Sequence, residues 1–385
     1  MNSVSPRGST DASVTALADM YRLKAGLSPY HHLDELTIGF DRLKRWVGPL
    51  LHDNGAGESL AIVTGAYGAG KTHTLQVARL VAARRGFATT AMSPDLGQSI
   101  LAHPQRLVSS LIENLEYYDG RHWVNAHDVF VRLWADEEGR QVLLRCLKEI
   151  RGGAEPIASV AREAIGWTRH AVATASVEPL TDHIFGVSLA SKANNVGTRE
   201  TAYGLLGLWS ELFRLHCGVK GLIVLLDEVE TLFRPNVCPS IASRRAAYRA
   251  FAGFLGGRLE RVRALWAITP DGLQHLNTEF EWQLGVALGM QGISRFENAQ
   301  GLLARFRAAS IHALPAPSRA DLVALARNIV GMHREARGET PRVDVTASEA
   351  ERMVGKGMDS PRLFARAVVS RLEAAWQRAS SVGEA

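Results

Sequence analysis

Residues 65–72 combine glycines, a lysine and a hydroxyl at a spacing that suits the phosphates of a nucleotide. The segment reads Gly65, Ala66, Tyr67, Gly68, Ala69, Gly70, Lys71 and Thr72. Its glycines let the backbone amides face the β- and γ-phosphates, Lys71 adds a positive charge, and the Thr72 hydroxyl can ligate Mg²⁺. A glycine turn with a solvated lysine is the alternative, but the apolar run before the segment and the helix-like stretch after it favour a phosphate loop. We therefore predict that this loop binds a nucleoside triphosphate.

A second motif places two carboxylates at the end of an apolar run. Residues 221–230 read Gly-Leu-Ile-Val-Leu-Leu-Asp-Glu-Val-Glu, which is typical of a strand buried between helix layers. We expect Asp227 to hold Mg²⁺ through a water, and Glu228 to orient and activate the water that attacks the γ-phosphate. A buried strand followed by an acidic turn is the alternative, which the upstream phosphate loop disfavours. We interpret the segment as a Walker B motif.

These two motifs require a sheet that brings their strands to one edge. Apolar runs that predict strands lie at 60–64, 87–92, 264–269 and 311–314. Residues 99–200 show mostly amphipathic helical periodicity, and helical sequence resumes at the start signals Ser318 and Asp321. The patterns predict an α/β fold with a parallel sheet, a helical insertion and a small C-terminal helical domain.

The same patterns predict five consecutive segments. They are a flexible N-terminus (1–32), the first part of a nucleotide-binding core (33–98), a mainly helical insertion (99–200), the second part of the core (201–317) and a helical lid (318–385). The first residues are rich in Ser, Thr, Gly and Pro, a composition typical of disorder. Ser360 and Pro361 are expected to open the last helix.

The overall composition is that of a globular protein without a targeting signal. Of 385 residues, 46% are apolar, but no run is long enough to cross a bilayer, so we expect a cytoplasmic protein. The net charge of +5 is compatible with nucleic acid, and arginines gather in a helix-like stretch at 244–263. That stretch could be a solvated face or a contact with DNA or a subunit. His31 and His32 lack the spacing of metal ligands, which favours a solvated turn.

The order of the motifs resembles the AAA+ superfamily of ATPases, in its initiator-like group. Four segments are in addition similar to the ATP-binding proteins of BREX-type bacteriophage-defence systems, BrxD-like proteins in particular. These segments are 65–72, 92–95, 107–115 and 226–232. The resemblance extends over about residues 33 to 378 and implies an αβα P-loop core with a helical insertion and a small helical lid.

The resemblance also implies roles for single residues. Lys71 and Thr72 correspond to the residues that bind phosphate and Mg²⁺, and Asp227 and Glu228 to the Walker B pair. Thr269, at the end of the 264–269 strand, corresponds to the sensor 1 residue that faces the γ-phosphate. In this superfamily that strand lies between the other two motif-bearing strands.

Three further residues match positions that contact the nucleotide from outside the sheet. Ile38 and Gly39 correspond to the apolar residue and the glycine that contact adenine ahead of the entry helix. Arg362 corresponds to sensor 2, an arginine near the start of a lid helix that reaches the nucleotide.

The resemblance further implies assembly. Arg305 corresponds to the arginine finger that completes a neighbouring subunit's site, with Arg295 and Arg307 as alternatives. The expected partners are further copies of this chain or other defence-system proteins, and DNA is compatible with the basic charge.

These implications together predict a Mg²⁺-dependent AAA+ ATPase. ATP binding and hydrolysis would drive conformational switching in a DNA-associated anti-phage assembly. The alternative is an ATP-gated, DNA-binding scaffold or filament of the transposition-helper type. A small-molecule kinase is disfavoured because the carboxylate pair suits the activation of water.

Overall fold

The chain forms two compact units. The computed structural model describes residues 12–52, 59–93, 103–187, 196–233, 240, 259, 261–289, 307–338 and 360–382. The first unit, here the helical unit, comprises Met1–Trp46, Gly65–Ala78 and Ala313–Ala385. The second, the sheet unit, comprises Val47–Thr64 and Arg79–His312.

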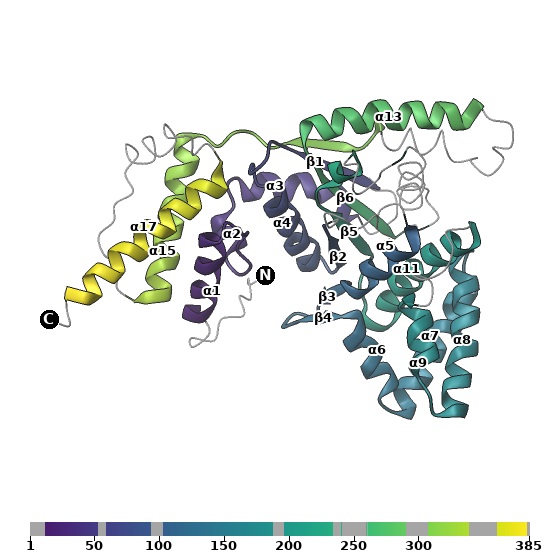
Figure 1. The fold of residues 1–385 in the computed structure, drawn as a ribbon. Helices are drawn as coiled ribbons and strands as arrows, with labels where there is room; N and C mark the ends of the chain where they lie inside the picture. The colour runs from purple at the N-terminus through teal and green to yellow at the C-terminus, as the bar shows by residue number, and fades with distance from the viewer. Residues whose placement is uncertain are drawn as a thin grey trace. The chain divides into compact units, whose positions relative to one another are not determined.

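Strands in the described part of the chain form one seven-stranded sheet (Figure 1). They are β1 (Leu60–Thr64), β2 (Ala88–Met92), β3 (Glu116–Tyr118), β4 (Trp123–Asn125), β5 (Leu222–Leu226), β6 (Val262–Ile268) and β7 (Ser310–Ala313). The order is β4-β3-β2-β5-β6-β1-β7, so β6 lies between β5 and β1, as the resemblance implied. The pairs β2–β5, β5–β6 and β6–β1 are parallel, which confirms the α/β class with a mostly parallel sheet.

The central strands consist of apolar residues that are buried along their whole length. Every residue of β1, β5 and β6 is buried, as expected for strands covered on both faces. The strand β6 begins earlier than predicted and includes Arg263, which is only 5% exposed. Arg263 is therefore no part of a basic helix face, and burial lowers its pKa. Arg261 lies 3.6 Å from the carboxylate of Glu211, and the other arginines of this stretch lie outside the described residues.

The predicted insertion at 99–200 is mainly helical but also contributes to the sheet. Its helices are α5 (Pro104–Glu113), α6 (Ala126–Trp134), α7 (Glu137–Arg151), α8 (Ile157–Thr174), α9 (Glu178–Ile184) and the start of α11 (Val196–Cys217). The short strands β3 and β4 were not predicted. They pair antiparallel and extend the sheet beyond β2, which suits their aromatic and β-branched residues.

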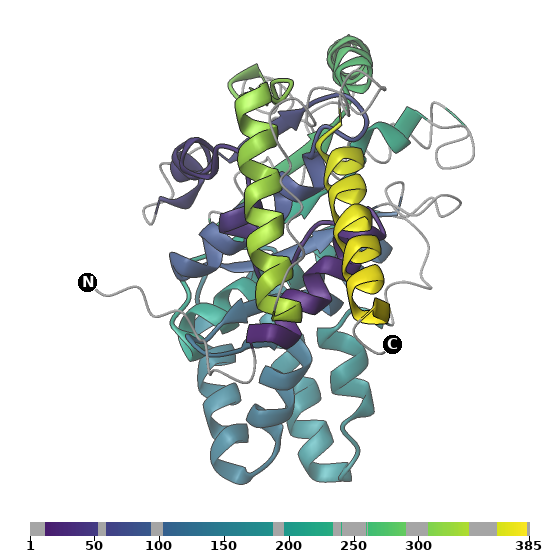
Figure 2. The same cartoon turned by 90° about the vertical axis from the view of Figure 1, so that its left-hand side faces the viewer.

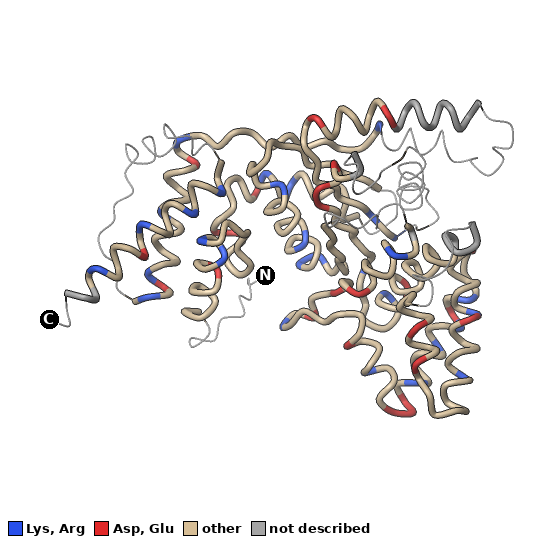
Figure 3. The backbone as a smooth tube through the Cα atoms, in the orientation of Figure 1, with Lys and Arg blue, Asp and Glu red and all other residues tan. Residues whose placement is uncertain are grey.

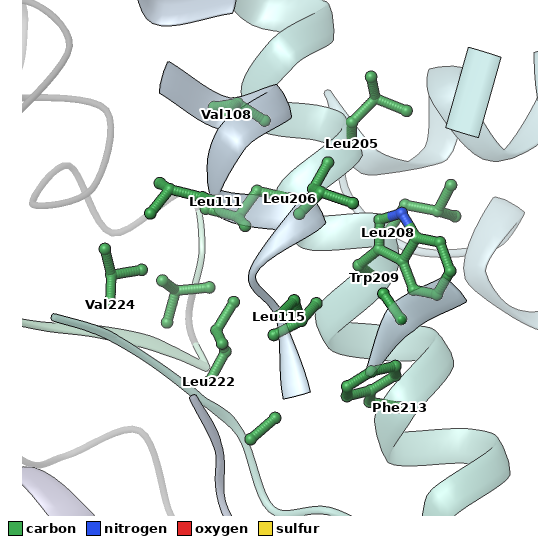
Figure 4. Packing of buried hydrophobic residues seen from close by; sticks show 14 of the residues in the cluster. Val108, Leu111, Leu115, Leu205, Leu206, Leu208, Trp209, Phe213, Leu222 and Val224 are labelled. Atoms are coloured by element: carbon green, nitrogen blue, oxygen red, sulfur yellow. The ribbon is translucent and has the colours of Figure 1, made fainter. Parts of the chain in front are cut away.

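Helices α5 and α11 form the main apolar core together with the sheet. Figure 4 shows Leu111 of α5 and Leu115, which follows α5, between β5 and the α11 residues Leu206 and Trp209. All of these side chains are buried. The indole N–H of Trp209 donates to the carbonyl of Ile184 at 2.7 Å, so its polar atom is also satisfied.

The helical unit is built from segments that are distant in the sequence. Its helices are α1 (Ala12–Lys24), α2 (Leu33–Leu36), most of α3 (Phe40–Val47), the first part of α4 (Lys71–Arg84), α15 (Arg319–Arg337) and α17 (Pro361–Val382). Helix α15 begins at the predicted signals, because Ser318 and Asp321 form a reciprocal capping box. Helix α17 begins at the expected Pro361.

Helix α1 contradicts the expectation of a flexible N-terminus at 1–32. Its apolar residues Ala16, Met20 and Leu23 are buried in one core with Ile329 of α15 and Phe364 of α17. Figure 2 shows the three helices alongside one another. The polar composition of the first residues was wrongly extended to a helix whose burial depends on distant partners.

A buried carboxylate fixes the chain after α1. Asp19 is fully buried and accepts the backbone N–H groups of Tyr30, His31 and His32 at 2.6, 2.8 and 2.9 Å. The Nδ1 atom of His32 lies 2.9 Å from the same carboxylate. The solvated turn expected for the two histidines is therefore wrong for His32, which is 2% exposed. Its burial follows from pairing with Asp19.

No helix in the described ranges combines the length and the apolar character that a membrane crossing would require.

Candidate functional site

Three predicted site segments leave the sheet at the same edge. Strand β1 ends at Thr64, which pairs with Ile268 at the end of β6, and β5 runs parallel beside β6. Parallel neighbours have their carboxyl ends at one edge, where ligands bind in open α/β sheets. The residues that follow β1, β5 and β6 in the chain are Gly65, Asp227 and Thr269.

The loop after β1 adopts a backbone that its glycines permit. Gly68 and Gly70 have φ angles of 79° and 101°, in a region that side-chain-bearing residues rarely adopt. The buried Lys71 donates from Nζ to the carbonyl oxygens of Gly65 and Ala66 at 2.8 and 3.1 Å. The positively charged ammonium group of Lys71 thus bridges two carbonyl groups at the start of the loop.

The rest of the loop leads into the N-terminus of α4. Ala69 donates its N–H to the carbonyl of Ala66 at 3.1 Å, while Tyr67 is 81% exposed at the tip. Helix α4 starts at Lys71, and Thr72 is exposed in its first turn. A helix N-terminus directs backbone N–H groups and the positive end of the helix dipole at an anion. The loop therefore has the geometry of a phosphate site.

A serine at the start of α17 contacts this loop within the helical unit. Ser360 Oγ donates to the carbonyl of Gly68 at 2.8 Å. The sequence indicated Ser360 only as a helix start signal. The predicted sensor 2 residue, Arg362, is exposed in the first turn of α17. Its Nε would lie 2.9 Å from a Cβ at Gly26, so the guanidinium packs against the backbone after α1.

The two carboxylates after β5 differ in their surroundings. Asp227 is 8% exposed, and its Oδ1 accepts the backbone N–H of Glu228 at 2.9 Å. Glu228 is half-buried and has a φ of 46°, which is strained for a residue with a side chain. Strain of this kind occurs preferentially at functional sites. It is an independent reason to regard Glu228 as functional.

Thr269, the predicted sensor 1 residue, also has a structural task. Its Oγ1 accepts the N–H of Gly272 at 3.2 Å and so caps α13 (Pro270–Gly289). Its own N–H donates to Glu230 Oε2 at 3.2 Å. Glu230, which the sequence did not single out, thereby links the segment after β5 to the end of β6. The Thr269 hydroxyl proton is not needed for the cap and can donate to a ligand.

The predicted adenine-contacting residues lie between α2 and α3. Gly39 has a φ of 70°, and its carbonyl accepts the N–H groups of Arg42 and Leu43 at 3.0 and 3.1 Å. Ile38 is partly buried and packs against the core of the helical unit. The glycine is required by the turn, and the part of Ile38 that stays accessible could contact a base.

A histidine that the sequence did not single out connects this turn with α4. Nδ1 of His73 lies 2.8 Å from Ser28 Oγ, and Nε2 lies 2.7 Å from Thr37 Oγ1. The Thr37 hydroxyl donates its proton to the carbonyl of Leu33, so it must accept from Nε2–H. Nδ1 then accepts from Ser28. This neutral form agrees with burial, which lowers the pKa of His73 to about 4.

The residues that could hold Mg²⁺ are of a suitable type. Thr72 offers a hydroxyl oxygen and Asp227 a carboxylate, and Mg²⁺ prefers such hard oxygen ligands with waters completing its shell. Within the described ranges, no group of three or more His, Cys, Asp or Glu side chains is arranged to hold a metal alone. A nucleotide-linked Mg²⁺ needs no such group, because phosphate oxygens supply further ligands.

Only one of the three finger candidates lies within the described residues. Arg295 and Arg305 lie outside the described residues, and Arg307 is exposed just before β7. The choice between the three arginines stays a prediction.

One protein family matches the N-terminal part of the chain. Residues 16–119 match the family described as BREX system ATP-binding protein BrxC/D. The match runs from α1 to the end of β3 and includes the phosphate loop and His73, and it confirms the resemblance over this segment. Asp227, Glu228 and Arg362 lie beyond it. Comparisons with curated proteins and with solved structures found no match.

Proposed function

We propose that this chain is an ATP-binding protein of a BREX-type defence system and that it hydrolyses ATP with Mg²⁺. The observation that carries the proposal is the loop of residues 65–72. It joins a buried parallel strand to a helix N-terminus and has glycines at positive φ. It also contains the buried Lys71, whose Nζ donates to the carbonyls of Gly65 and Ala66. The same loop lies inside the segment that matches the BrxC/D family.

The sheet supports an AAA+ arrangement of the core. The strand between β1 and β5 is β6, and the polar residue Thr269 follows it directly. The carboxyl ends of β1, β5 and β6 lie at one edge of the sheet, which is where ligands bind in open α/β sheets. We assign Thr269 as the residue that senses the γ-phosphate there.

Residue roles in hydrolysis follow from the chemistry of each side chain. Glu228 accepts a proton from a water while the water oxygen attacks the γ-phosphorus. The bond from that phosphorus to the β–γ bridging oxygen breaks, and ADP and phosphate are released. Lys71 neutralises charge on the phosphate oxygens, with Arg362 contributing from α17. Mg²⁺, held by Thr72 and through water by Asp227, would supply the remaining positive charge.

Conformational switching would follow from the helical unit. Ser360 contacts the phosphate loop directly, so a change in the loop on hydrolysis would be transmitted to α17. Assembly with other copies or with other defence proteins would place Arg305, our first choice among the three arginines, at a neighbouring site.

Binding and turnover of ATP by matched variants test these roles. Lys71→Ala should lose ATP binding, because the loop loses its only buried charge among the described residues. Calorimetry measures the ATP affinity of this variant.

Glu228→Gln should keep ATP binding but lose at least about a hundredfold in kcat, since general base catalysis contributes on that order. Arg305→Ala should bind ATP and regain activity when mixed with Glu228→Gln.

Each variant has an outcome that would refute its role. Wild-type affinity in Lys71→Ala would remove the basis of the proposal. Near-normal hydrolysis by Glu228→Gln would require another base, and a failure of the mixture to recover activity would argue against a finger acting between subunits.

A further inference from the structure

His73 connects two segments with different expected tasks. It follows Thr72 directly in the first turn of α4, while Thr37 directly precedes Ile38 and Gly39. The imidazole ring bridges Thr37 and Ser28 with bonds of 2.7 and 2.8 Å. A single side chain therefore joins the phosphate-binding segment to the segment expected to contact the base.

Both partners of the ring are themselves held in place. The carbonyl of Ser28 accepts from Arg22 Nε at 2.7 Å, which ties it to α1. The hydroxyl of Thr37 bonds to Leu33 in the first turn of α2. The tautomer with the proton on Nε2 satisfies both partners, because it donates to Thr37 and leaves Nδ1 to accept from Ser28, whose hydroxyl also lies 3.4 Å from the carbonyl oxygen of Pro29. A side-chain network whose members all have partners makes the segments that it joins more rigid.

We propose that His73 is a positioning residue that holds the turn at Thr37–Gly39 in register with the phosphate loop, so that base and phosphates of one nucleotide bind together. This inference rests on the proposed function. According to this proposal, the bridge is the reason why the protein binds ATP more tightly than tripolyphosphate, which lacks the base. The phosphate loop has its own contacts, through Lys71 and the α4 N-terminus, and binds phosphates without the bridge.

Two substitutions at Thr37 separate this role from a general effect on folding. Thr37→Val keeps the shape of the side chain and removes the hydroxyl, whereas Thr37→Ser keeps the hydroxyl. Affinities for Mg·ATP and for Mg·tripolyphosphate are measured for the full chain by calorimetry, together with KM and kcat for ATP. Ser28→Ala repeats the test at the other end of the ring.

We expect Thr37→Val to weaken Mg·ATP binding and raise KM about tenfold, the effect of one lost hydrogen bond. Its affinity for Mg·tripolyphosphate and its kcat should be unchanged, and Thr37→Ser should behave as wild type. An equal loss for both ligands, or no loss for either, in both Thr37→Val and Ser28→Ala would overturn the inference. A wild-type chain that binds neither ligand would instead overturn the proposed function.

Discussion

At the phosphate loop, backbone conformation limits the residues that can be tolerated as strictly as the chemistry does. Gly68 and Gly70 both have positive φ angles, but their surroundings differ. A Cβ at Gly68 would lie 2.5 Å from Ser360 Oγ, whereas a Cβ at Gly70 would meet no atom within 4 Å. The two glycines therefore separate backbone strain from the contact with α17.

We predict that Gly68→Ala and Gly70→Ala both weaken ATP binding, and that Ser360→Ala partly rescues only the first. The left-handed backbone conformation costs a side-chain-bearing residue about 1 to 2 kcal/mol. If the loop of the ATP-free variant relaxes out of this conformation, ATP binding must restore it, and the affinity falls roughly tenfold. Removing the Ser360 hydroxyl relieves the additional clash at position 68 alone. A double-mutant cycle of ATP affinities measures this coupling. No rescue of Gly68→Ala, or equal rescue of both variants, would contradict the predicted clash.

The site residues differ in how far local sequence could reveal them. Lys71, Thr72 and Asp227 belong to motifs whose spacing encodes their chemistry. His73 and Ser360 act through partners far away in the chain: Thr37 is 36 residues from His73, and Gly68 is 292 residues from Ser360. No local pattern specifies such pairs, because they depend on how the helical unit packs.

Among the helices and strands, the same distinction separates the correct predictions from the wrong ones. The strands β1 and β5 and the capped start of α15 follow from apolar runs and capping residues, which act locally. Helix α1 was missed because its apolar face is buried only through packing against α15 and α17, which are distant in the sequence. The strands β3 and β4 are too short to show a clear alternation and depend on the edge of β2.

The attachment of α1 to the following turn depends on ionisation. Burial favours a raised pKa for Asp19, but hydrogen bonds from His32 and from the backbone of residues 30–32 outweigh it and lower the pKa. The hydrogen bond to Asp19 raises the pKa of His32 against the opposing effect of burial, and the charges of Asp19, Glu35 and Glu335 add to the rise. The pair is therefore most stabilising when Asp19 is ionised and His32 is protonated.

This pair predicts a loss of stability as the pH rises above the ordinary pKa of histidine. The contribution of His32 is complete below its ordinary pKa of 6.5 and is lost as the pH rises through the raised value of the folded state. The contribution of Asp19 is present above 3.8 and is lost on acidification through its lowered pKa. The melting temperature should thus fall as the pH rises above 6.5, and His32→Gln should flatten this dependence.

The exposed neighbour His31 provides the matched control. Its backbone N–H reaches Asp19, but in the described structure only the side chain of His32 hydrogen-bonds to that carboxylate. His31→Gln should keep the wild-type pH profile. A profile that is the same for His32→Gln and wild type would show that the pair contributes no pH-dependent stability.

At the scale of the whole molecule, the net charge of +5 indicates a partner only where the basic side chains gather on one exposed surface. The predicted basic stretch at 244–263 lies mostly outside the described residues, and Arg263 is buried. Figure 3 shows basic residues at intervals along α17, whose charged residues are Arg362, Arg366, Arg371, Glu373 and Arg378. The one acidic residue, Glu373, is buried and accepts from Arg337 at 2.9 Å. The exposed charge of α17 is therefore entirely positive.

If the proposed assembly includes DNA, α17 is the described element best suited to contact its phosphates. Arg371 and Arg378 are exposed and seven residues apart, so they share one helix face. Replacing both by Gln should weaken binding of duplex DNA of any sequence and lower the slope of log affinity against log salt by about 2, one for each lost phosphate contact. ATP affinity should be unchanged. Arg140→Gln with Arg162→Gln is the control for the loss of two positive charges, because these arginines lie on α7 and α8 of the sheet unit and not on α17. An unchanged slope in the α17 variant, measured by fluorescence anisotropy, would exclude this face as the DNA contact.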